Sequence, residues 1–167
     1  MTLFCRKLKI FSDAAVTLLI WVYFILGFLL LFAPRYGWAW FRAGDREAAF
    51  QRLNQRFFHS FFRVLSFITP GLILHVHGDV GAIRSSIIIS NHLSYLDPLL
   101  LVSLLEKQRT IVKKTFFKVS IFSYLLRESG FMPATNGGED SALMIRNCEN
   151  IKAYLASGGN VFIFPEG

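Results

Sequence analysis

A histidine and an aspartate five positions apart are the residues of this chain best suited to chemistry. His92 and Asp97 lie in residues 91–97 (NHLSYLD), directly after the apolar run at 87–89. Residues five apart point to opposite faces of a strand and lie about 140° apart on a helix, so they meet only if the chain turns between them. After such a turn, the carboxylate could bond one imidazole nitrogen while the other removes a proton from a substrate hydroxyl. The spacing therefore predicts a general-base pair.

The same residues also fit a purely structural interpretation. Asp97-Pro98 is typical of a helix start with proline in the first turn, and Ser94 three positions before Asp97 resembles a capping box. Taken alone, the segment favours neither interpretation.

The elements expected to position this segment alternate between strands and helices. Residues 87–89 (III) and 161–164 (VFIF) are continuous apolar runs, typical of central strands buried on both faces. We expect strands at residues 72–77, 87–89, 110–112 and 161–164, and helices at residues 96–105, 116–128 and 139–157. This order predicts an α/β fold with a mixed, largely parallel sheet and covering helices. Parallel sheets place their chemistry beyond the carboxyl ends of the strands.

Two motifs together resemble a known family. The pattern NHxSxxDP occupies residues 91–98 after one apolar strand, and FPEG occupies residues 164–167 after another. This pair is similar to the glycerophospholipid acyltransferases, whose best-known members acylate lysophosphatidic acid, and the similarity covers about residues 70–167. It implies that His92 and Asp97 form the catalytic HxxxxD dyad.

The resemblance also implies where substrates bind. Glu166 and Gly167 would belong to the acceptor-binding motif, and Lys113 follows a core strand at a place where members often have lysine. The family usually has an arginine after a middle glycine, and that place falls here on Thr135 or Asn136. The FPEG motif usually continues into Thr-Arg, so we expect this chain to be an N-terminal portion with an incomplete domain.

The implied activity is O-acyl transfer in phospholipid biosynthesis. A fatty acyl group would pass from acyl-CoA or acyl carrier protein, acting as a co-substrate, to the free hydroxyl of a lysophospholipid. No cofactor and no metal ion are expected. The alternative is a non-catalytic membrane-associated lipid-binding or adaptor fragment.

Other chemistries find less support in the residues. A serine hydrolase based on Ser90 or Ser94 lacks the Gly-x-Ser-x-Gly nucleophile motif. His75 and His77 would share one face of a strand and could form a metal site with His92 and Asp97, but two polar residues on an exposed strand face explain them with no extra assumption. The lysines after residue 112 fit either a substrate site or a solvated basic patch.

The composition points to a membrane. Hydrophobic residues make up 53% of the 167 amino acids and charged residues only 17%, which excludes a disordered chain and is too apolar for a typical soluble domain. The net charge of +7 accompanies 18 phenylalanines, so we expect contact with anionic lipids rather than nucleic acid. Cys5 and Cys148 form no CxxC motif, and a reducing, cytosol-facing environment is the simplest expectation.

A transmembrane helix is predicted at residues 14–33. This run of twenty residues carries no charge, and a helix of that length spans about 30 Å of hydrocarbon. Pro34 is expected to end the span. Three basic residues precede the run, as in a signal peptide, but the run is too long and its end is a poor cleavage site. We therefore expect a single-pass anchor.

The chain thus divides into three predicted segments. Residues 1–44 hold a basic segment, the span and an aromatic connector; residues 45–69 form an amphipathic helix; residues 70–167 form the α/β domain. The amphipathic helix carries a phenylalanine stripe, which either lies on the bilayer surface or packs on the following domain. Charges flank the span on both sides and do not settle its orientation. Cytoplasmic acyl donors would place the domain on the cytoplasmic face, and the upstream helices resemble those of bacterial inner-membrane members.

Overall fold

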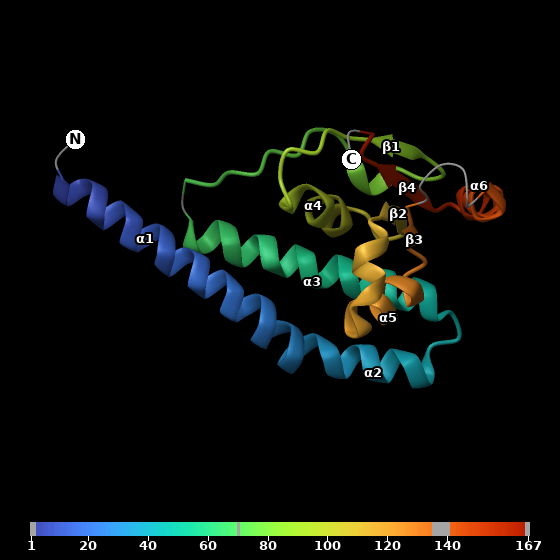
Figure 1. Cartoon of the computed structure of the whole chain (residues 1–167), viewed down its shortest axis with the longest axis horizontal. Helices are drawn as coiled ribbons and strands as arrows, with labels where there is room; N and C mark the ends of the chain where they lie inside the picture. The colour runs from blue at the N-terminus through green and yellow to red at the C-terminus, as the bar shows by residue number, and fades with distance from the viewer. Residues whose placement is uncertain (1–2, 70, 135–140, 166–167) are drawn as a thin grey trace.

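The computed structural model of the chain describes residues 3–69, 71–134 and 141–165 (Figure 1). It begins with one long helical rod built from α1 (Leu3–Val22), the π-helical segment η1 (Tyr23–Phe32) and α2 (Ala33–Arg42). Within the described residues, Lys9–Arg42 is the one helix long and apolar enough to cross a membrane. Only 11% of its most apolar window is buried in the protein, unlike the core helix of a soluble domain.

The helix does not end at Pro34, where the sequence predicted the end of the membrane span; the span boundary itself stays a prediction. Pro34 stands in the first turn of α2. The preceding Ala33 N–H donates to the carbonyl of Phe28, five residues back, so the π-helical segment passes directly into α2. The helix continues to Arg42.

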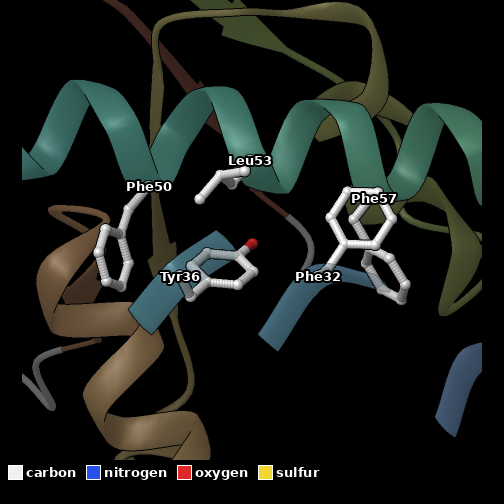
Figure 2. Close-up of a cluster of buried hydrophobic side chains, with 5 residues drawn as sticks. All are labelled: Phe32, Tyr36, Phe50, Leu53 and Phe57. Carbon is white, nitrogen blue, oxygen red and sulfur yellow. The ribbon is translucent and has the colours of Figure 1, made fainter. Parts of the chain in front are cut away.

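Helix α3 (Arg46–Ile68) runs back alongside this rod (Figure 1). Its N-cap is Asp45, whose side chain accepts a hydrogen bond of 3.0 Å from the Ala48 N–H. The phenylalanine stripe of α3 is buried within the protein, as Figure 2 shows for the cluster formed by Phe32, Tyr36, Phe50, Leu53 and Phe57. The stripe packs mainly on the preceding helical rod, which is neither the bilayer surface nor the following domain that the sequence left open.

The α/β domain packs on the other side of α3. Its helices are α4 (Leu96–Leu104), α5 (Ser120–Glu128) and α6 (Ser141–Ala156), with short 3₁₀ segments η2 (Val80–Ala82) and η3 (Lys114–Lys118). Phe58 of α3 contacts both described hydrophobic clusters, the one beside the rod and the one around Phe162 in the sheet. The helical rod and the domain thus share a continuous core.

The sheet contains β1 (Ile87–Ile89), β4 (Asn160–Ile163), β2 (Gln108–Val112) and β3 (Met132–Pro133), in that spatial order. Each of the three strand pairs is parallel. The predicted α/β fold with a largely parallel sheet and covering helices is confirmed.

Two strand predictions are wrong. Residues 72–77 are extended but belong to no strand, because alternation describes any extended chain and says nothing about a pairing partner. Strand β1 lies at the edge of the sheet rather than at its centre, since β4 occupies the place between β1 and β2. Ile87 and Ile89 are accordingly 54% and 68% exposed, and only Ile88 faces the core.

Two further boundaries differ from expectation. The helix predicted at 116–128 is divided into η3 and α5. Strand β3 was not predicted, because its two residues are too few to show a periodic pattern.

Candidate active site

The carboxyl ends of the strands meet at one edge of the sheet. Ile89 of β1 pairs with Ile163 of β4, and Phe162 of β4 pairs with Thr110 of β2. Continuing this register by two residues places Asn91 and Lys113 at the same level, two strand spacings or about 10 Å apart. The segments that follow β1, β2 and β4 therefore leave the sheet together.

The chain turns sharply between β1 and α4. One oxygen of Asp97, Oδ2, accepts hydrogen bonds of 2.7 Å from the N–H groups of both Leu93 and Ser94. The Ser94 hydroxyl in turn accepts a bond of 3.1 Å from the Leu96 N–H. The bond from the Ser94 N–H to Asp97 is one half of a capping box, but the Ser94 hydroxyl bonds Leu96 rather than Asp97. Helix α4 begins at Leu96, so Asp97 is not the N-cap that the sequence suggested. These bonds also supply the turn that His92 and Asp97 need in order to meet.

The same carboxylate oxygen faces the histidine. Asp97 Oδ2 lies 3.5 Å from His92 Nδ1, and the two side chains are 30% and 31% exposed. This distance is at the long end for a hydrogen bond. Catalytic bonds are often long without substrate and shorten in the reacting complex. The structural and the chemical interpretations thus use one aspartate and are compatible.

Asp97 carries a negative charge at neutral pH. The hydrogen bond from the Ser94 N–H holds the pKa of its carboxyl below the usual value, with smaller contributions from the Leu93 N–H and from His92, against the opposing effect of burial. The carboxylate can therefore stabilise a positive imidazole at Nδ1 and fix the tautomer that leaves Nε2 to act as a base.

Phe164 joins the two sequence motifs in space. Its ring lies 4.8 Å from the His92 ring, centroid to centroid, with 35° between the planes. Phe164 also contacts Phe162, which is fully buried in the sheet. The core thus supports one face of the imidazole. The sequence placed Phe164 in a motif but gave no sign of this contact.

The remaining predicted substrate residues are described only in part. Lys113 is exposed at the end of β2, where it precedes η3. Glu166, Gly167, Thr135 and Asn136 lie outside the described residues. His75 and His77 have stacked rings 6.3 Å apart, and within the described ranges no three His, Cys, Asp or Glu side chains gather as a metal site would require.

A buried polar network at the opposite side of the sheet was not anticipated. Arg109 of β2 donates two bonds of 2.7 Å to the carboxylate of Glu47 in α3, from Nε and Nη2. Its guanidinium also lies 4.0 Å from the ring centroid of Tyr154 in α6. Arg109 is therefore occupied by a structural ion pair and is turned away from the carboxyl edge.

Gln51 extends this network. Its Nε2 donates to Glu47 Oε1 at 2.9 Å and to the Ser129 carbonyl at 3.0 Å, and its Oε1 accepts a bond of 2.8 Å from the Tyr154 hydroxyl. Gln51 is 1% exposed, so these bonds are shielded from water. Because Glu47 and Gln51 belong to α3 and their partners to the domain, the network fixes α3 to the domain. Glu47 lies in the first turn of α3 and was not among the predicted site residues.

Comparison with known proteins gives one positive result. The model of a family described as Acyltransferase matches residues 74–167, more than half of the chain. No curated protein and no solved structure matches. The matched range contains β1 to β4, the His92–Asp97 turn and the terminal motif. This chain belongs to the Acyltransferase family.

Proposed function

We propose that this protein is a membrane-anchored O-acyltransferase of phospholipid biosynthesis. It transfers a fatty acyl group from the thioester of acyl-CoA or acyl carrier protein to the free hydroxyl of a lysophospholipid, of which lysophosphatidic acid is the model. The observation that carries the proposal is the placement of His92 between the Asp97 carboxylate and the Phe164 ring.

His92 acts as the general base in this mechanism. Nε2 takes the proton of the acceptor hydroxyl as the oxygen attacks the thioester carbonyl, and the ionised Asp97 stabilises the resulting imidazolium at Nδ1. The tetrahedral intermediate then expels the thiolate, which recovers the proton from His92. Thiols have a pKa near 8.5, so the leaving group needs no strong acid and one histidine suffices.

The surroundings of His92 favour a lipid acceptor. Leu93 and Tyr95, on either side of Ser94 in the same turn, are each 90% exposed. Such large apolar side chains suit contact with a bilayer in which the acceptor is embedded. Lys113 supplies a cation at the same edge for an acceptor or donor phosphate.

The apolar helix supports membrane anchoring. Residues 14–33 cross the bilayer once, and the domain lies on the cytoplasmic side, where its acyl donors are found. Protease protection of sealed inverted and right-side-out vesicles tests this orientation. Cleavage within residues 71–134 only in right-side-out vesicles would contradict it.

Replacement of His92 tests the activity. Membranes carrying the His92→Ala variant should lose transfer from labelled acyl-CoA to lysophosphatidic acid by about 10²–10⁴-fold. His77→Ala is the matched control, since His77 lies in the extended segment away from the sheet. Activity retained by His92→Ala would overturn the mechanism. If the unchanged protein binds anionic vesicles but transfers no acyl group, the non-catalytic adaptor replaces the proposal.

A further inference from the structure

An apolar cavity of about 460 Å³ lies between the helical rod and α5. Phe28, Ala33, Tyr36, Gly37 and Trp40 line it from the rod. Ser120, Tyr124 and Leu125 line it from α5. Its volume falls within the range of about 300–1,000 Å³ typical of small-molecule sites. It is on the rod side of α3, whereas the His92 turn precedes α4 on the other side (Figure 1).

Small residues keep this cavity open. Gly37 lies inside α2, and a Cβ built on it would meet no atom within 4 Å. Glycine is the least favourable residue after proline inside a helix. A side chain would therefore fit at this position and favour the helix, yet it would occupy the cavity. The glycine preserves space rather than relieving a clash.

The cavity runs along the helical rod, as an acyl chain would run beside a helix that spans the membrane. Phe28 lies within the predicted span at 14–33, and Trp40 lies beyond its end. The twelve-residue step from Phe28 to Trp40 rises by at most about 18 Å, because the part up to Phe32 is π-helical and more tightly wound. This length compares with about 15 Å for half of the hydrocarbon layer. With the proposed span at residues 14–33, the lining passes from acyl-chain depth to headgroup depth.

A cation stands at the headgroup end. The Arg46 guanidinium lies 4.0 Å from the ring centroid of Trp40. Arg46 also favours the ionised form of Tyr124, although burial and then Glu128 raise the pKa of that phenol. An arginine held by an aromatic ring at the mouth of an apolar cavity suits a phosphate oxygen.

We infer that this cavity binds one acyl chain of an anionic phospholipid from the surrounding leaflet, with the lipid phosphate at Arg46. The site is separate from the acyl-transfer centre. It rests on the membrane placement proposed above but not on the chemistry of His92, and His92→Ala should leave lipid binding unchanged.

Quenching of a single tryptophan tests the site directly. The chain contains three tryptophans, so Trp21→Phe and Trp38→Phe leave Trp40 in the cavity wall as the only one. In non-ionic detergent, phosphatidic acid with dibrominated acyl chains should quench Trp40 fluorescence saturably. Unbrominated phosphatidic acid should compete for the site.

Filling the cavity should abolish this binding. In the same background, Gly37→Leu should remove the saturable quenching while circular dichroism shows an unchanged or more stable helix. Ser120→Leu fills the cavity from the opposite wall and should act alike. Saturable quenching that survives both variants would overturn the site. If the protein with Gly37 binds no lipid and Gly37→Leu changes its oligomeric state, a second copy of the chain occupies the cavity instead of a lipid. That result would overturn the proposal.

The charge at the mouth has a matched control. Arg42 also lies over a tryptophan, 5.0 Å from the Trp38 ring centroid, and Trp38 does not line the cavity. Arg46→Gln should weaken phosphatidic acid binding roughly five- to tenfold and weaken brominated phosphatidylcholine less, because choline offsets the charge of its phosphate. Arg42→Gln should change neither affinity, because the ring beside Arg42 belongs to residue 38, which does not line the cavity. Equal losses in both variants would overturn recognition of the phosphate by Arg46.

Discussion

At the amino ends of its parallel strands this domain holds its polar side chains in short hydrogen bonds, whereas at the carboxyl ends it leaves its acid–base pair loosely bonded. Arg109 makes two short bonds to Glu47, and Asn160 at the start of β4 is 1% exposed and donates to the Ile83 carbonyl at 2.8 Å. His92 and Asp97, in contrast, are separated by 3.5 Å, although their exposure of about one-third equals that of Glu47. The polar groups at the amino ends hold the structure together, and those at the carboxyl ends remain accessible to a substrate.

This difference follows from what each region must do. A buried charge is costly unless its partner is fixed, so Glu47 and Arg109 stabilise the protein only as an intact pair. A general base must instead change its protonation state during each turnover. The substrate must therefore reach the base, and one of its nitrogen atoms must have no partner within the protein. Substitutions at the two edges should therefore affect different measurements.

The largest effect is expected for Asp97→Asn. Asparagine keeps an oxygen for the Leu93 and Ser94 N–H groups but lacks the charge that stabilises protonated His92. Acyl transfer should fall by about 10²–10⁴-fold, while the melting temperature should change little. Transfer from acyl-CoA and thermal unfolding are measured on the same membrane preparation. Unchanged transfer would show that Asp97 only shapes the turn.

Glu47→Gln should reverse this pattern. It leaves the Arg109 guanidinium, 17% exposed, without a carboxylate, and the free energy of unfolding should drop by about 2–3 kcal/mol. Activity per folded molecule should remain unchanged. Denaturant unfolding in detergent provides the measurement, and Glu149→Gln on the exposed face of α6 serves as control. Equal stability of the two variants would mean that the ion pair contributes nothing.

Gly130→Ala should damage the same network through the backbone. Gly130 has φ of +73°, and an added Cβ would collide with the Glu47 carboxylate and lie 2.7 Å from Arg109 Nε. We expect a loss of about 2 kcal/mol in unfolding free energy. Gly158→Ala is the matched control, because its φ is +84° but its Cβ would meet no atom within 4 Å. A loss no greater than that of Gly158→Ala would exclude the collision.

The smallest effect concerns the pH dependence of the carboxyl edge. The folded state lowers the pKa of Asp97 below its unfolded value of 3.8, so the unfolded chain binds the proton more readily. The stabilisation from Asp97, about 1 kcal/mol, is complete above pH 4 and is lost as the pH falls through the lowered pKa. The stability difference between the unchanged protein and Asp97→Ala should therefore shrink below pH 4. A difference that is constant with pH would contradict the ionised carboxylate as its source.

Local sequence patterns predicted much of the fold. The apolar runs gave three of the four strands, and Leu96–Leu104 is helical where leucine spacing placed a helix. The strand predicted at 72–77 failed because an alternating pattern reports exposure and not pairing. The edge position of β1 could not be predicted from local sequence either. It depends on β4, the last of the described strands, which lies between β1 and β2.

The candidate site shows the same division. The sequence by itself determined that His92 and Asp97 flank a strand-to-helix turn, because hydrogen bonds between residues three to five apart depend on local backbone geometry. Only the tertiary structure decided that Phe164 packs on His92 and that Glu47 pairs with Arg109, 62 residues away. Contacts of this kind depend on strand order and helix packing, which the whole chain selects by burying its apolar surface and pairing its buried charges.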